Sequence, residues 1–211
     1  MFFNQSKTNR PFIDQPYLYF EAGFCKVFFI IISKLVTGEK MAKMTKIVIV
    51  LNIIGFLLQS QIERSDLFFG LNRYFLEAGL FWQPLSSMFM HGGLTHLAMN
   101  MVVLFQFGTL LETTRGSRFF LQLYLIGGIL TSLLSFLFMY VLALNHVLVG
   151  ASGAISVLIG WIAYKDPYNR KGLVIAIMLI SFAPLLLGMN IAWYAHLIGF
   201  GLGMLWGRIR P

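Results

Sequence analysis

A serine and a histidine stand out because each lies in a stretch that is otherwise apolar. Ser152 sits in Gly-Ala-Ser-Gly-Ala over 150–154, and His196 sits in the last hydrophobic stretch of the chain. Polar and ionisable side chains inside a membrane-spanning segment cost free energy, so they point to function by default. A hydroxyl beside an imidazole is the smallest set of groups that makes an activated nucleophile. The two residues therefore suggest covalent catalysis by a serine.

A third hydrophobic stretch adds His96 and Asn100, which are four residues apart and so share one face of a helix. Ser152 is expected about five residues inside its helix and His196 about six inside its own, which puts these groups at one depth, about 8–10 Å below the outer boundary. His96, Asn100 and the free backbone N–H groups at the start of the Ser152 helix are able to bind the oxyanion of an acyl-transfer intermediate.

Each polar residue alone has an ordinary explanation. A buried serine bonds back to its own helix, and histidine or asparagine often forms hydrogen bonds between membrane helices. The coincidence in depth favours a joint catalytic role. No carboxylate lies at this depth, because Glu112 and Asp166 fall at the other ends of their helices, so the chain offers a Ser–His dyad and not a triad. The histidines have neither a carboxylate nor a thiolate beside them, so neither a metal site nor a cofactor is expected.

Small residues line both helices that carry the dyad. Gly199 and Gly203 follow His196 by three and seven residues, and Ser152 is followed by Gly153 and Ser156 at helical spacing. Small residues let membrane helices approach closely, so the two helices are expected to pack together. Ordinary helix packing without catalysis explains such a stripe equally well.

The composition indicates an integral membrane protein. Of the 211 residues 58% are hydrophobic and 11% charged, with a mean hydropathy of +0.77, whereas a soluble domain carries about 25% charged residues. The apolar runs are continuous, which favours helices over a barrel. The predicted fold is an all-α bundle of six membrane-spanning helices, at about 46–62, 89–111, 119–143, 147–164, 172–188 and 190–207.

The basic residues predict the orientation. All lysines and arginines except Arg64 and Arg73 fall on one side of a six-span bundle, which places both termini in the cytoplasm. The net charge of +8 is spread over several loops, so it indicates contact with lipid headgroups and not a nucleic-acid partner. Residues 1–45 are expected to form a cytoplasmic or interfacial segment, with an interfacial helix at Phe24–Val36, and 46–211 one membrane domain. The outer connection 63–88 is expected to lie partly in the membrane interface.

These motifs resemble those of the rhomboid intramembrane serine proteases. The resemblance covers about residues 80–207 and rests on four matching patterns: Gly150-Ala-Ser152-Gly153, Ala195-His196-x-x-Gly199 with Gly203, His91-x-x-x-x-His96-x-x-x-Asn100, and Glu112-x-x-x-Gly116 with Arg118 and Phe119. It implies that Ser152 is the nucleophile and His196 the general base. It further implies oxyanion-hole roles for His96 and Asn100.

The resemblance also implies supporting roles. His91 would help to hold the outer loop, and Glu112 with Gly116 would form a structural turn. Two positions depart from the family pattern. Ser156 stands where the family often has an aromatic residue that packs on the catalytic histidine. An aromatic residue from another helix would have to supply that packing here. Gln83 follows Trp82 where arginine is frequent.

The expected function is cleavage of transmembrane protein segments near the outer face, in the inner membrane of a bacterium. Two alternatives stay open. A catalytically inactive relative would bind membrane helices without cutting them, and a channel or transporter would need a polar path through the inner half. Ser181 and Asn190 are almost the only polar residues available there in the last two spans.

Overall fold

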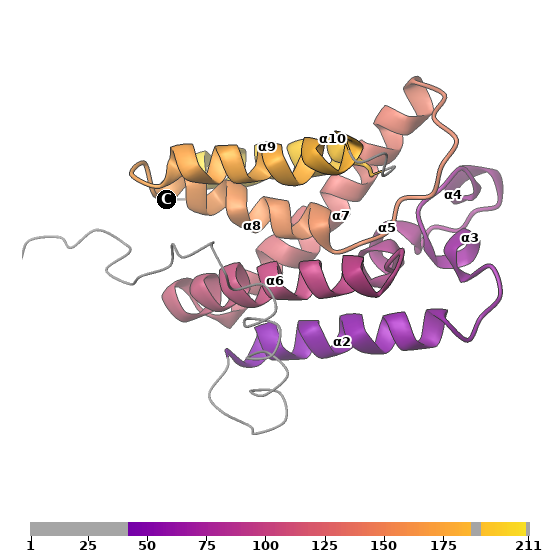
Figure 1. Ribbon diagram of the computed structural model, residues 1–211, viewed down its shortest axis with the longest axis horizontal. Helices are drawn as coiled ribbons and strands as arrows, with labels where there is room; N and C mark the ends of the chain where they lie inside the picture. Colours follow the sequence, from indigo (N-terminus) through magenta and orange to yellow (C-terminus); the bar gives the residue numbers. More distant parts are fainter. Residues whose placement is uncertain (1–41, 187–190, 210–211) are drawn as a thin grey trace, which may run out of the picture.

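The computed structural model describes residues 42–186 and 191–209, and every named element in these ranges is helical. Six long helices form the bundle in Figure 1: α2 (Lys43–Gln59), α6 (Leu94–Arg115), α7 (Ser117–Val141), α8 (Ser152–Lys165), α9 (Arg170–Leu186) and α10 (Trp193–Ile209). Between α2 and α6 lie four short helical turns, α3 (Ser65–Phe69), α4 (Tyr74–Glu77), α5 (Gln83–Ser86) and the 3₁₀ turn η1 (Ser87–Phe89).

The prediction of an all-α fold is confirmed for the described residues. Two of the helices, α6 and α7, are long and apolar enough to cross a membrane by length and composition. The other long helices have 14 to 17 residues, so the count of six spans stays a prediction. The expected interfacial helix at Phe24–Val36 and most of the 1–45 segment lie outside the described residues.

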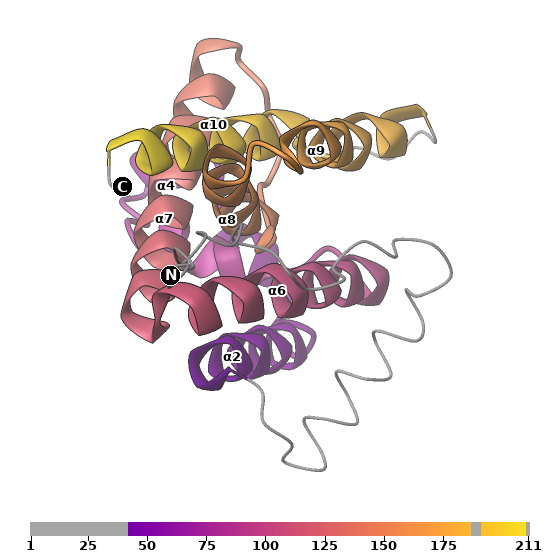
Figure 2. The ribbon, with the colours of Figure 1, turned by 90° about the vertical axis from the view of Figure 1, so that its left-hand side faces the viewer.

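Helix α8 forms the centre of the bundle. It packs against α6, α7, α9 and α10, which surround it in the end-on view of Figure 2. Its residues from Ala154 to Ala163 are all buried. A helix that is apolar on every face is stable only when other helices cover it, so the apolar sequence of α8 explains its central position.

The outer helices expose apolar side chains instead of polar ones. Large hydrophobic side chains are exposed along α2, α7 and α9. Examples are Leu57, Leu137 and Leu179, whose exposed fractions are 58%, 54% and 59%. Contiguous apolar surface of this extent is unusual for a soluble monomer. It fits helices whose outer faces contact lipid.

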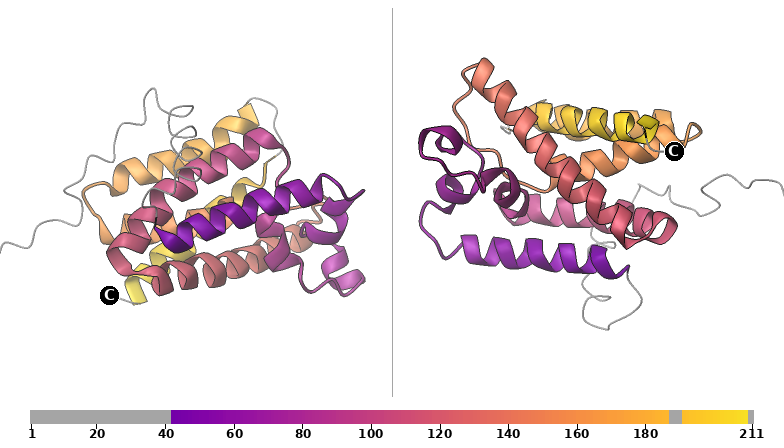
Figure 3. Two further views of the ribbon diagram at one scale, coloured as in Figure 1. Left: turned by 90° about the horizontal axis from the view of Figure 1, so that it is seen from below. Right: turned by 180° about the vertical axis from the view of Figure 1, so that it is seen from behind.

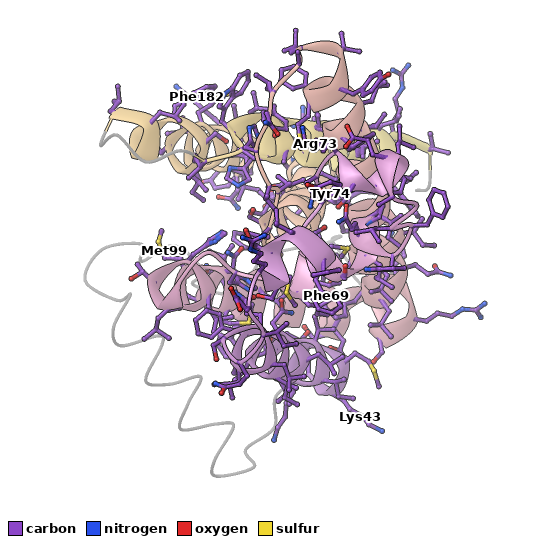
Figure 4. The ribbon with its side chains drawn as sticks, turned by 90° about the vertical axis from the view of Figure 1, so that its right-hand side faces the viewer. Lys43, Phe69, Arg73, Tyr74, Met99 and Phe182 are labelled. Atoms are coloured by element: carbon purple, nitrogen blue, oxygen red, sulfur yellow. The ribbon has the colours of Figure 1, made fainter. Side chains whose placement is uncertain are left out.

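The described chain begins and ends at one end of the bundle. The views of Figures 1 and 3 agree that α2 starts where α10 finishes, while α3, α4 and α5 lie at the opposite end. Figure 4 looks onto that opposite end, where Phe69, Arg73 and Tyr74 are labelled. The orientation of the bundle relative to a membrane stays a prediction.

Two expected helix starts are wrong. Helix α8 begins at Ser152 and not near 147, because the preceding residues are extended: Leu148 pairs with Leu71, and Gly150 has a φ of +124°. Helix α6 begins at Leu94 and not at 89. Ser152 is therefore the first residue of its helix and does not lie five residues inside it.

Candidate active site

Ser152 and His196 lie in hydrogen-bond contact. His196 Nε2 is 2.9 Å from Ser152 Oγ, a normal length for such a bond. Ser152 is the first residue of α8 and is half-buried, whereas His196 is the fourth residue of α10 and is only 7% exposed. The imidazole is thus held in the interior, whereas Ser152 is partly accessible.

Glycines set the distance between the two helices. A Cβ on Gly199 would overlap the carbonyl oxygen of Gly153, and a Cβ on Gly203 would overlap that of Val157. The backbones of α8 and α10 are therefore in direct contact, which only glycine permits. This close approach brings Ser152 within reach of His196.

The turn before α8 is shaped by Gly150. Its φ of +124° lies in a region that residues with a Cβ rarely adopt. A Cβ there would also lie 2.8 Å from Cε1 of His96. The His96 ring therefore packs directly over the turn. The N–H groups of Ser152 and Gly153 belong to the first turn of α8, where a helix leaves its N–H groups without an intrahelical acceptor.

His96 presents an N–H to the same place. The backbone N–H of Gly92 donates to His96 Nδ1 at 3.3 Å, so a neutral His96 carries its proton on Nε2. That Nε2 lies 3.0 Å from the position a Cβ of Gly150 would take, and the same position is 3.7 Å from Ser152 Oγ. The Nε2–H donor of His96 and the Ser152 hydroxyl thus both lie next to Gly150.

Asn100 lies one helical turn after His96 and is 5% exposed. One N–H of its side-chain amide donates to the backbone oxygen of His96 at 2.9 Å. An amide group has two N–H donors. One of them forms this bond within α6, and the second is left for another acceptor.

The His91 side chain packs against His96. The buried His91 ring meets the His96 ring edge to face at a centroid distance of 5.3 Å. Its backbone is paired with the side chain of Gln59 at the end of α2, through bonds of 2.6 and 2.8 Å. The described residues contain no cluster of three or more histidine, cysteine, aspartate or glutamate side chains suited to a metal ion.

Glu112 lies far from this site, at the other end of α6. Its carboxylate accepts the backbone N–H groups of Met44 and Thr45 and the hydroxyls of Thr45 and Ser117, at 2.7 to 2.9 Å. Gly116, with a φ of +87°, joins α6 directly to α7. This cluster ties α2, α6 and α7 together.

The two departures from the family pattern have local partners. Ser156 donates its hydroxyl to the Ser152 backbone oxygen at 2.7 Å. The buried Gln83 accepts the N–H of Asn72 and donates to the backbone oxygen of Leu67. Gln83 therefore fastens the connection between α2 and α6 from within.

Sequence reasoning misplaced one residue, Ser181 of α9. We expected it in the inner half of the bundle, but its hydroxyl lies 3.3 Å from His196 Nδ1. Ser181 lies five residues before Leu186, where α9 ends, and so at the level of His196. Asn190 lies outside the described residues.

A small cavity borders Ser152 on the side of α7. It has a volume of about 20 Å³, and its lining includes the hydroxyl residues Ser87, Thr131 and Ser132. A cavity of this size has room for about one water molecule, and the hydroxyls offer it hydrogen-bond partners.

Comparison with known proteins gives consistent matches. The model of the Rhomboid domain matches residues 78–210. RHOMBOID-like protein 4 of Arabidopsis thaliana is 35% identical over 144 residues, covering 62% of this chain and 35% of the relative. Rhomboid protease GluP of Bacillus subtilis is 39% identical over 93 residues, covering 44% and 17%. Presenilin-associated rhomboid-like protein A, mitochondrial, of Danio rerio is 26% identical over 151 residues, covering 59% and 39%.

The matched region spans less than half of these three relatives. The family model covers more than half of this chain. The extended apolar surface and the apolar helices α6 and α7 agree with the membrane location of that family. This protein therefore belongs to the rhomboid family of integral membrane proteins.

Proposed function

We propose that this protein is a serine endopeptidase that cleaves transmembrane segments of other proteins. The observation that carries the proposal is the 2.9 Å contact between His196 Nε2 and Ser152 Oγ at the first residue of the central helix. The name of one bacterial relative, a rhomboid protease, supports the same activity.

In the proposed mechanism, His196 Nε2 accepts the hydroxyl proton of Ser152 as Oγ attacks the carbonyl carbon of the scissile peptide bond. The tetrahedral intermediate then collapses, and the proton moves from His196 to the leaving amine. A water molecule next attacks the acyl-enzyme ester, and His196 takes its proton and returns it to Ser152. The cavity beside Ser152, lined partly by hydroxyls, is suited to holding that water.

Three groups support an oxyanion next to Ser152. The first-turn N–H groups of α8 are without intrahelical acceptors, the Nε2–H of His96 lies beside the serine, and Asn100 retains one N–H of its amide. Donors fixed before the reaction stabilise the charge that develops in the transition state. His91 and Gln59 hold His96 in place from behind.

We further propose the membrane arrangement. The bundle spans the membrane six times with both termini in the cytoplasm, and Ser152 lies near the outer face, where water for hydrolysis is available. The bacterial inner membrane is the proposed location. A substrate segment that unwinds there exposes a peptide bond to the serine.

The test is labelling of the full chain in detergent with a fluorophosphonate probe, which reacts with activated serines. We expect labelling of the wild type and none of the Ser152→Ala variant. A folded wild-type protein that stays unlabelled and does not cleave a transmembrane reporter would contradict the proposal. That result would favour a relative that binds membrane helices without cutting them.

A further inference from the structure

The His196 imidazole has a second polar partner besides Ser152. Its Nδ1 lies 3.3 Å from the hydroxyl of Ser181, which comes from a different helix, α9. The hydroxyl of Ser181 also lies 2.7 Å from the backbone oxygen of Ile177, one turn earlier. Ser181 is fully buried, so no water competes for these contacts.

Counting protons assigns the direction of each bond. The backbone oxygen of Ile177 cannot donate, so the single hydroxyl proton of Ser181 goes to it. The Ser181 oxygen is then an acceptor toward His196, and the imidazole proton must lie on Nδ1. A neutral imidazole with its proton on Nδ1 has a free lone pair on Nε2, which is the atom that faces Ser152.

Nothing else among the described residues holds the ring in this way. No aromatic ring stacks on His196, so the aromatic residue expected from another helix is not found in the described part of the chain. Ser156, at the position four residues after Ser152, uses its hydroxyl on the Ser152 backbone. Among the described residues, the bond from α9 is therefore the hydrogen bond that holds the His196 ring from the side opposite Ser152.

The position of Ser181 is itself fixed by its neighbour. Phe182 packs against Trp193 of α10 at a ring-centroid distance of 5.6 Å. Phe182, labelled in Figure 4, marks this part of α9. The aromatic contact docks α9 onto α10 only three residues before His196, at the level where the hydrogen bond forms.

We propose that Ser181 is a positioning residue that orients His196 and fixes its Nδ1–H tautomer for proton transfer with Ser152. This inference rests on the proposed protease function. Ser181 supplies to the dyad the orienting third group that a carboxylate supplies in a Ser-His-Asp triad. Because a hydroxyl is neutral, it sets orientation and tautomer but adds no charge to stabilise the imidazolium.

The kinetic test compares three variants of the full chain on a transmembrane reporter in detergent. Ser181→Ala removes the acceptor, and we expect kcat to fall about tenfold with KM unchanged, as for the loss of one hydrogen bond. Ser181→Cys keeps nearly the same volume but accepts hydrogen bonds weakly, so it should resemble Ser181→Ala. Ser181→Thr keeps the hydroxyl and should retain most of the wild-type kcat.

A spectroscopic test reads the tautomer without turnover. The chain has four histidines, so ¹⁵N-histidine labelling gives few signals, and the spectrum of His196→Gln assigns the one that matters. We expect His196 of the wild type to be protonated on Nδ1, and Ser181→Ala to shift this signal toward a mixture of tautomers. Ser135→Ala, which removes another fully buried serine hydroxyl on α7, is the control and should change neither spectrum nor kcat.

The outcomes separate the two proposals. A wild type that cleaves, with Ser181→Ala equal to it in kcat and in the His196 signal, overturns the role of Ser181 and leaves the protease proposal standing. A proton on Nε2 of wild-type His196 also overturns it. A wild type with the Nδ1–H signal but no Ser152-dependent cleavage contradicts the protease function, while the hydrogen bond itself stands.

Discussion

Two polar clusters at opposite ends of the bundle differ in how many of their hydrogen-bonding groups already have partners. Around Glu112, both carboxylate oxygens accept two donors each, from Met44, Thr45 and Ser117. Around Ser152, the first-turn N–H groups of α8 and one N–H of Asn100 remain available. Glu112 and His96 are sixteen residues apart on α6, which is roughly 24 Å along a helix.

The difference matches a structural role for the Glu112 cluster and the catalytic role that we propose for the cluster at Ser152. Glu112 caps the first turn of α2 from a neighbouring helix, since α2 has no side-chain cap of its own. A saturated carboxylate has nothing left to offer a substrate. The cluster at Ser152 keeps donors without acceptors next to a half-buried serine, and in the proposed mechanism these donors stabilise the transition state.

The largest effect is expected from breaking the dyad. His196→Ala should lower kcat more than about a thousandfold, because the serine loses its base. Measured cleavage of a reporter, with circular dichroism to check the fold, tests this. Combining His196→Ala with Ser152→Ala should cost little beyond either change alone; additive losses would mean that the two residues do not act as a unit.

Separating α8 from α10 should follow in size. A methyl group on Gly199 would overlap the Gly153 carbonyl, so Gly199→Ala should displace His196 from Ser152 and lower kcat by about a hundredfold. Gly201→Ala is the matched control, since a Cβ there meets nothing within 4 Å. Equal activity of the two variants would show that the glycine contact does not set the dyad distance.

Removing one oxyanion donor should have a smaller effect. Asn100→Ala is expected to lower kcat by roughly 10- to 100-fold, because the His96 Nε2–H and the backbone N–H groups remain. Parallel measurement of fluorophosphonate labelling and reporter cleavage tests it. Complete inactivation of a well-folded Asn100→Ala protein would mean that the other donors do not reach the oxyanion.

A change in the Glu112 cluster should affect stability and not kcat. Glu112→Ala leaves the first-turn N–H groups of α2 without their acceptor and should lower the free energy of unfolding by about 1–3 kcal/mol. The kcat of the folded fraction should change little. Thermal unfolding in detergent measures the first quantity. A large fall in kcat without loss of stability would contradict the distinction between the clusters.

The sequence singles out Ser152 and His196 because both are polar residues in apolar stretches, a signal that is local in the chain, and the structure places their side chains in hydrogen-bond contact. The expected depths are partly wrong, since α8 starts at Ser152 and α6 at Leu94. The residues just before α8 are held by long-range contacts: Leu148 pairs with Leu71, and the Gly150 N–H donates to the backbone oxygen of Ser87. No window of local hydropathy contains such partners.

Ser181 shows most clearly the difference between what the local sequence predicts and what tertiary contacts decide. In sequence it is one serine in an apolar helix, where bonding back to its own turn is the ordinary expectation. That bond exists, to Ile177, but the remaining lone pairs of the hydroxyl face His196. The sequence by itself determined the helical class, the membrane character and the residues able to do chemistry, because these follow from composition and spacing. Only the tertiary structure decided which groups meet, because hydrogen bonds between helices depend on how glycine contacts and aromatic packing align them.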